Sequence, residues 1–102
     1  MTIKTMDAEK ALEALVGPLT FGKAIRCVRQ CDEMSQVEFA KKLGLSKSHL
    51  CDIEQDRKTV SPERAARFAK ILGYSREQFV CLSLQALIDK AGLSMTVSLS
   101  AA

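Results

Sequence analysis

Four polar side chains gather at the start of a predicted helix in the middle of the chain. They are Lys47, Ser48, His49 and Asp52. Lysine can donate to guanine O6 and N7, serine can donate or accept, and a carboxylate can accept from cytosine N4. Short hydrogen-bonding side chains at a helix N-terminus also suit contacts with phosphates. The four side chains are therefore candidates for contact with base edges, Lys47, Ser48 and Asp52 directly and His49 as a flanking contact to phosphate or a thymine methyl group.

Two short helices separated by a turn must position these side chains. Phe39, Ala40 and Leu43 form one apolar face of a helix predicted over about 36–43. Gly44 follows the last periodic residue, where a left-handed stop suits a residue without Cβ. Ser46 is a natural N-cap for a second helix over about 47–54. This arrangement lets a second helix protrude from a small domain and enter the major groove of DNA.

An enzyme or a metal protein is a weaker interpretation of the same residues. Ser48, His49 and Asp52 lie within little more than one helical turn, so they cannot converge as a catalytic triad. Cys27 and Cys31 are spaced i, i+4, with His49 or Cys51 as conceivable further ligands. The four cysteines, the last of them Cys81, show no zinc-type spacing. We expect free cysteines acting as small hydrophobes, no metal, no cofactor and no catalytic activity.

Composition is typical of one small globular domain. The chain has 102 residues, 47% of them hydrophobic and 26% charged, with a formal net charge of +3. This charge permits nucleic-acid binding but does not by itself indicate it. The apolar run over 79–88 is far shorter than the ~20 residues that span a bilayer. The first residues contain no secretory apolar region, so a cytoplasmic location is expected.

From Phe21 to about Leu82 the chain resembles the phage repressor and Cro type of helix-turn-helix domain, often called the Xre family. The matching segments are Ser35-Gln36, Phe39-Ala40, Leu43-Gly44-Leu45-Ser46, Ile53-Glu54, Arg57-Lys58, Ser61-Pro62-Glu63, Ala69-Lys70-Ile71-Leu72-Gly73, Tyr74-Ser75 and Gln78-Phe79. The resemblance implies an all-α, five-helix, lambda-repressor-like fold. The chain departs from the family pattern at Gln55-Asp56, where Asn-Gly is common. Asp56 tolerates a left-handed turn, but its charge would weaken a phosphate contact.

The chain divides into three predicted parts. Residues 1–18 form an N-terminal extension with a helix over about 7–16, ended by Gly17-Pro18. Residues 19–91 form the helix-turn-helix domain, whose outer helices are expected over about 20–32, from Ser61 to Leu72 and from Ser75 to Lys90. Residues 92–102 form a C-terminal tail.

The resemblance also implies roles for residues outside the cluster. Gln36 and Ser46 would contact phosphates, and Arg57, Lys58 and Lys23 would contact the DNA backbone unless they are simply solvated surface charges. Arg29 in the first core helix would form a structural ion pair with Glu54 at the end of the recognition helix.

The last helix has more apolar surface than one packing face requires. Val80, Leu84, Leu87 and Ala91 form one stripe, and Phe79, Leu82 and Ala86 form another. We expect Phe79, Leu82 and Ala86, together with Val97, to form a homodimer interface. The tail over 94–100 alternates polar and apolar residues, which predicts either a strand pairing with its two-fold mate or a frayed terminus.

Together these features predict sequence-specific binding to double-stranded DNA by a homodimeric transcriptional repressor of bacterial or phage type, acting at a palindromic operator. One alternative is the antitoxin half of a toxin–antitoxin pair, with a toxin protein as a further partner. Another is a protein-interaction module that has kept the fold without binding DNA.

Overall fold

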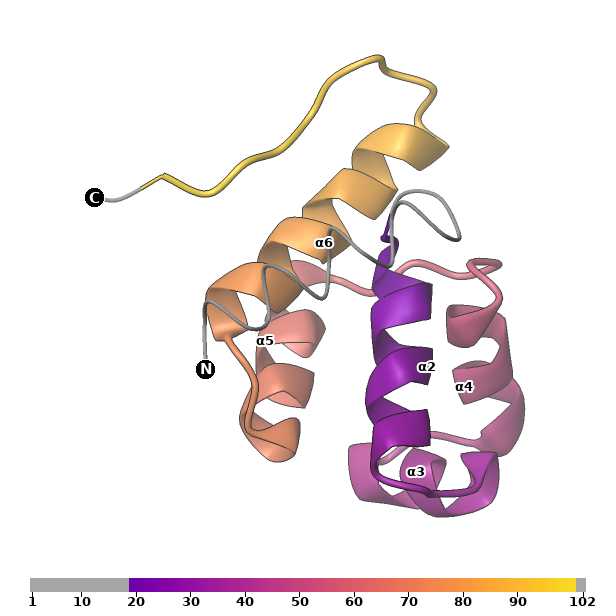
Figure 1. Ribbon diagram of the computed structural model, residues 1–102. Coiled ribbons are helices and arrows are strands. Elements are labelled where there is room, and N and C mark those ends of the chain that lie inside the picture. The colour runs from indigo at the N-terminus through magenta and orange to yellow at the C-terminus, as the bar shows by residue number, and fades with distance from the viewer. Residues whose placement is uncertain (1–18, 101–102) are drawn as a thin grey trace.

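A computed structural model describes residues 19–100, which contain five α-helices and no strand. The helices are α2 (Phe21–Cys31), α3 (Gln36–Leu43), α4 (Lys47–Glu54), α5 (Pro62–Leu72) and α6 (Arg76–Lys90). Figure 1 shows α2 and α4 side by side with α3 across their ends, whereas α5 packs along α6 in the other half. The predicted all-α, five-helix architecture is confirmed. The predicted extension over 1–18, with its helix over 7–16, lies outside the described residues.

Hydroxyl side chains set where each of the five helices begins. Each N-cap hydroxyl accepts a hydrogen bond from the backbone N–H three residues later, which satisfies an otherwise unpaired donor. The capping residues are Thr20, Ser35, Ser46, Ser61 and Ser75. At α3 the bond is reciprocated, because the Glu38 carboxylate accepts from the Ser35 N–H at 3.1 Å. That bond lowers the pKa of Glu38.

The hydrophobic core draws on all five helices. Its completely buried side chains include Ile25, Phe39, Leu50 and Phe68. From α5, Ala65, Phe68 and Ala69 lie in the core and Leu72 packs against it. Apolar burial of this kind stabilises a domain by roughly 25 cal/mol per Å². The core therefore fixes both the α2–α4 half and the α5–α6 half around one centre.

Phe79 belongs to this core, so its prediction as a dimer contact is wrong. Its side chain is 4% exposed, and its ring meets the Phe21 ring edge to face with centroids 5.8 Å apart. Leu82, one turn later, also packs partly buried against the core. Leu87, from the other stripe, is 39% exposed. Phe79 and Leu82 therefore contact the core, whereas the other members of the two stripes are half-buried or exposed.

The tail lies along α6 of its own chain, and its residues up to 100 form no strand within that chain. The Gln85 side-chain amide bonds to the tail at two points, donating to the Met95 carbonyl at 3.0 Å and accepting from the Val97 N–H at 2.7 Å. Leu82, Ala86 and Val97, three of the predicted dimer residues, line a groove of about 870 Å³ between α6, the tail and the start of α2. These side chains are thus partly covered within one chain.

Within residues 19–100, no helix is long and apolar enough to cross a membrane.

Candidate nucleic-acid interface

Helix α4 has one buried side and one exposed side. Leu50, Ile53 and Glu54 point into the protein and are each at most 4% exposed. On the other side lies a shallow surface hollow of about 230 Å³, lined by Lys47, Ser48, Cys51, Asp52 and Arg57. Three of the four predicted base-reading residues therefore share one outward surface. We call this surface the α4 front.

The turn before α4 holds the helix at the surface. Gly44 takes a left-handed conformation with φ of 73°, as predicted for the end of α3. The Leu45 N–H then bonds to the Ala40 carbonyl at 2.8 Å, and the Ser46 hydroxyl caps α4 by accepting from His49 N–H at 3.1 Å. Ala40 itself is 2% exposed, which fits the close approach of the two helices.

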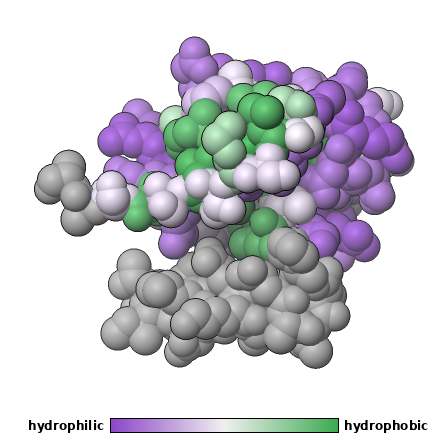
Figure 2. Space-filling view, turned by 90° about the horizontal axis from the view of Figure 1, so that it is seen from above, coloured by the Kyte–Doolittle hydropathy of each residue, from purple (hydrophilic) through white to green (hydrophobic). Residues whose placement is uncertain are grey.

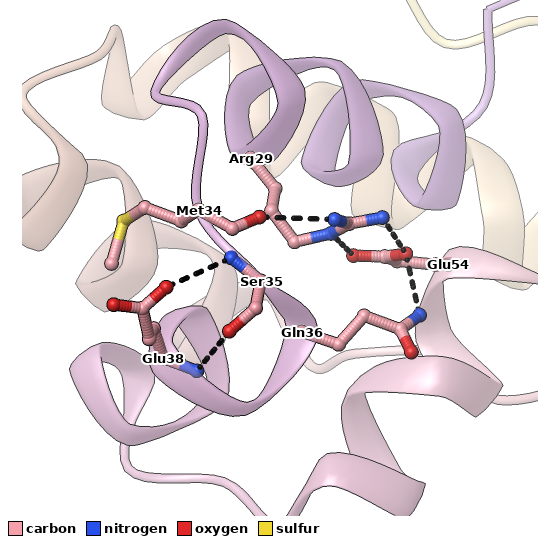
Figure 3. Close-up of polar contacts among 6 residues, drawn as sticks. All are labelled: Arg29, Met34, Ser35, Gln36, Glu38 and Glu54. Atoms are coloured by element: carbon pink, nitrogen blue, oxygen red, sulfur yellow. Dashed lines mark hydrogen bonds and ion pairs between the residues drawn. The ribbon is translucent and has the colours of Figure 1, made fainter.

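A buried ion pair fixes the end of α4 against α2. Arg29 Nε lies 2.7 Å from Glu54 Oε2, and Arg29 Nη2 lies 3.1 Å from Glu54 Oε1 (Figure 3). The third guanidinium nitrogen donates to the Met34 carbonyl at 3.1 Å. The Glu54 side chain is 1% exposed and that of Arg29 is 15% exposed. The predicted structural ion pair is confirmed, and it is bidentate and largely excluded from water.

Gln36 belongs to the same network, which corrects its predicted role. Its amide nitrogen donates to Glu54 Oε1 at 3.0 Å, so Figure 3 shows the side chain directed inward from the start of α3. We expected that amide to hold a phosphate. It instead gives the buried Glu54 carboxylate a further donor, which helps to satisfy a charge that is costly to bury.

Asp52 is also placed differently from the prediction. Its Oδ1 accepts from Arg57 Nε at 2.9 Å, and its Oδ2 lies 3.5 Å from Lys58 Nζ. The Arg57 hydrogen bond is the largest cause that lowers the pKa of Asp52. The carboxylate is therefore ionised and paired within the chain, so it does not stand free to accept from cytosine. Arg57 and Lys58, predicted as DNA-backbone contacts, both face this carboxylate.

His49 follows Ser48 on α4 but does not line the α4 front, and it is half-buried. Desolvation lowers its pKa most, followed by the positive charges of Arg64 and Lys58, whereas Asp52 raises it. The imidazole is therefore neutral at pH 7.

Asp56 has a structural role that the sequence analysis missed. Its φ of 59° confirms that it accepts the left-handed turn after α4. Its carboxylate accepts from the Gly22 N–H at 3.2 Å and from the Thr20 hydroxyl at 2.9 Å, at the N-terminus of α2. An anion at this helix end is favoured by the helix dipole. The acidic residue in the turn was therefore a recognisable capping residue, but the N–H group that it caps, that of Gly22, lies 34 residues earlier in the sequence.

Gly22 makes this close approach feasible. A Cβ at this position would clash with the backbone carbonyl of Ile53 and with the Asp56 carboxylate. The first turn of α2 therefore packs directly on the end of α4. Lys23, predicted as a backbone contact, follows in the same turn and is half-buried.

The cysteines are separate thiols in this fold. Cys27, Cys51 and Cys81 are half-buried and Cys31 is exposed. In the part of the chain that the structure describes, no group of three cysteine, histidine or acidic residues is placed to hold a metal ion.

Comparisons with known proteins agree with this geometry. Residues 32–79, just under half of the chain, match the family model described as Helix-turn-helix. With the α3–Gly44–α4 arrangement, this match identifies the segment as a helix-turn-helix domain of the Xre/Cro type. Domains of this class are typically DNA-binding modules, not enzymes.

A relative among curated proteins is the immunity repressor protein of Bacillus phage phi105. It is 38% identical over 55 residues, which cover 54% of this chain and 38% of the relative. The chain thus matches well under half of the relative's length. No solved structure matches the chain significantly.

Proposed function

We propose that this chain binds double-stranded DNA in a sequence-specific way and acts as a homodimeric transcriptional repressor. The observation that carries the proposal is the α4 front, an exposed helix surface with Lys47 and Ser48 at its N-terminal end. The bidentate Arg29–Glu54 pair holds this helix rigidly against the scaffold. A fixed, outward helix with short polar donors fits the major groove.

In this proposal α4 enters the major groove with its N-terminal turn leading. Lys47 donates to guanine O6 or N7, and Ser48 donates or accepts at a neighbouring base. Ser46, the N-cap of α4, is a candidate phosphate contact, as are Lys23 and Lys58. Such contacts set position without reading sequence. A domain over 19–91 that presents α4 in this way would leave the tail over 92–102 free of contacts with DNA.

Dimerisation is supported by apolar side chains where α6 ends and the tail begins. Leu87, Leu93 and Met95 are 39%, 48% and 56% exposed. Figure 2 shows an apolar patch beside the tail at this end of the molecule. A two-fold contact here would cover the patch and present two copies of α4 to half-sites about one helical turn apart.

Repression is the simplest consequence of such binding, because an occupied operator that overlaps a promoter excludes polymerase. The name of the phage relative, an immunity repressor, supports this choice over an antitoxin. The absence of a membrane-spanning helix among residues 19–100 is compatible with work on cytoplasmic DNA.

Selection from a random pool of duplex DNA tests the proposal. We expect enrichment of a palindrome whose half-sites lie about 10 base pairs apart. Binding of the selected duplex should weaken with salt, with a slope of about −0.9 for each phosphate contact. A pool that shows no enrichment after several rounds would overturn sequence-specific binding. A stable monomer at micromolar concentration in sedimentation would overturn the dimer alone.

A further inference from the structure

Arg57 lies on the α4 front although it comes after the end of the helix. Its side chain lines the same hollow as Lys47 and Ser48. Arg57 Nε donates to Asp52 Oδ1 at 2.9 Å, and Nη2 lies 3.6 Å from Cys51 Sγ. The guanidinium therefore folds back over the last turn of α4 and does not extend toward the flank of the domain.

This pairing leaves a defined set of donors free. Asp52 accepts from Nε and Cys51 Sγ accepts from Nη2, so both N–H groups of Nη1 and one N–H group of Nη2 remain. The Arg57 side chain is 59% exposed. A planar guanidinium that presents two parallel donors matches guanine O6 and N7. Because the Asp52 carboxylate already holds the plane, less side-chain entropy is lost when those donors meet a base.

Lys58, the residue after Arg57, faces the same carboxylate but does not line the α4 front. Its Nζ lies 3.5 Å from the other oxygen of the same carboxylate. Lys58 is absent from the lining of the α4 front and instead lines the groove beside α6, together with Thr20 and Gln78. Two neighbouring cations thus share one anion, but only Arg57 lies among the candidate base-reading residues.

We infer that Arg57 reads a guanine in the operator and that Asp52 is the positioning residue that orients its guanidinium. This inference rests on the proposed DNA binding and refines it. It replaces the expected roles of Arg57 as a backbone contact and of Asp52 as a cytosine reader. Cys51, beside the guanidinium, would lie close to the same base pair.

The test measures binding of the full chain to the pool-selected duplex and to its single-base-pair variants. For the wild type, one G·C pair should be preferred. Arg57→Ala should reduce preference at that pair by between about 5- and 150-fold, with other positions unchanged. Arg57→Lys keeps the positive charge but lacks the two parallel donors of a guanidinium. This variant should therefore lose the preference at the same G·C pair and retain the salt slope of the wild type. Lys58→Ala is the matched control and should weaken all duplexes equally.

Asp52→Asn supplies the test of positioning. Loss of the carboxylate should reduce preference at the same G·C pair, and adding it to Arg57→Ala should cause little further loss there. A purely structural role for Asp52 would change stability without moving preference at that pair.

The inference is overturned if Arg57→Ala weakens every duplex equally and lowers the salt slope by about one phosphate contact. Arg57 is exposed, so its variants should fold like the wild type, and circular dichroism of each variant checks this. A wild-type chain that binds no duplex would instead overturn the proposed function, and this inference with it. If the Arg57→Ala variant keeps the full wild-type preference at that G·C pair, this result overturns the inference alone.

Discussion

Replacing Arg29 by Met removes the cation from the least exposed of the three ion pairs within residues 19–100. Methionine keeps much of the aliphatic stem of arginine, so most of the local packing is preserved. Glu54, whose side chain is 1% exposed, then retains only the Gln36 amide at 3.0 Å. Two charge-assisted bonds to the carboxylate, at 2.7 and 3.1 Å, are lost. The substitution therefore leaves a buried and poorly compensated charge.

The expected cost in the free energy of unfolding is about 3–5 kcal/mol. Small domains have total stabilities of roughly 5–15 kcal/mol, so this is a large fraction of the whole. For a domain of this size, the cost corresponds to a fall in Tm of ~12 °C or more. The Met34 carbonyl also loses its Arg29 donor at 3.1 Å, which acts in the same direction.

Urea unfolding followed by circular dichroism measures the effect, provided that the slope with denaturant stays constant. Arg57→Met is the matched control, because it removes an arginine that pairs with a carboxylate at the surface. The Arg57 and Asp52 side chains are 59% and 28% exposed, so the unfolding midpoint should barely move.

A second variant separates charge from packing. Arg29→Met combined with Glu54→Leu removes both charges, and an apolar replacement of a buried pair is often close to neutral. We expect this double variant to recover most of the lost stability, even if Arg29→Met alone fails to fold. The reasoning is refuted if Arg29→Met is as stable as Arg57→Met, or if the double variant remains as unstable as Arg29→Met.

Four further predictions follow from the site and the fold. Lys47→Ala should relax base preference at one position by ~1–3 kcal/mol in a titration of variant duplexes, whereas uniform weakening would make Lys47 a phosphate contact. The pKa of His49 is lowered in the folded protein, so protonation of this residue reduces the free energy of unfolding. The contribution of neutral His49 to stability is fully present above about pH 6.5 and is lost as the pH falls below that value. A phosphate nearby would favour the imidazolium, so affinity for DNA should rise between pH 7.5 and 6 in the wild type and stay flat in His49→Gln. Gly22→Ala should cost roughly 1–3 kcal/mol in urea unfolding, because a Cβ meets the Ile53 carbonyl, and an unchanged midpoint would show that the helices separate easily. Leu87→Glu should shift sedimentation toward monomer, whereas Val37→Gln, at a residue that is 49% exposed on α3, should not.

Local signals allowed the central helices to be predicted well. The bounds of α3 and α4 match the predicted ranges, because Ser46 and Gly44 mark the ends of these helices through their own hydrogen bonding and backbone conformation. Within α4, the apolar Leu50 and Ile53 are buried at helical spacing, whereas Lys47 and Ser48 are exposed. Where one residue decides the local structure, the sequence was sufficient.

Partners distant in sequence were harder to predict. Asp52 and Arg57 pair only because the chain after α4 turns back over it, and helical periodicity does not extend past the end of a helix. Asp56 accepts from the N–H of Gly22, 34 residues earlier in the first turn of α2, and no local pattern reveals this contact. Phe79 was misplaced because α6 is apolar on more than one side, so its spacing does not indicate which face meets the core.

The central claim is that the exposed surface of α4 contacts a DNA duplex. The most direct measurement is the change in backbone amide NMR signals when the selected duplex is added to the full-length chain. We predict the largest changes from Ser46 to Asp52 and at Arg57, with small changes along α6. Changes confined to α6 and the tail, or none at saturating duplex, would contradict the account.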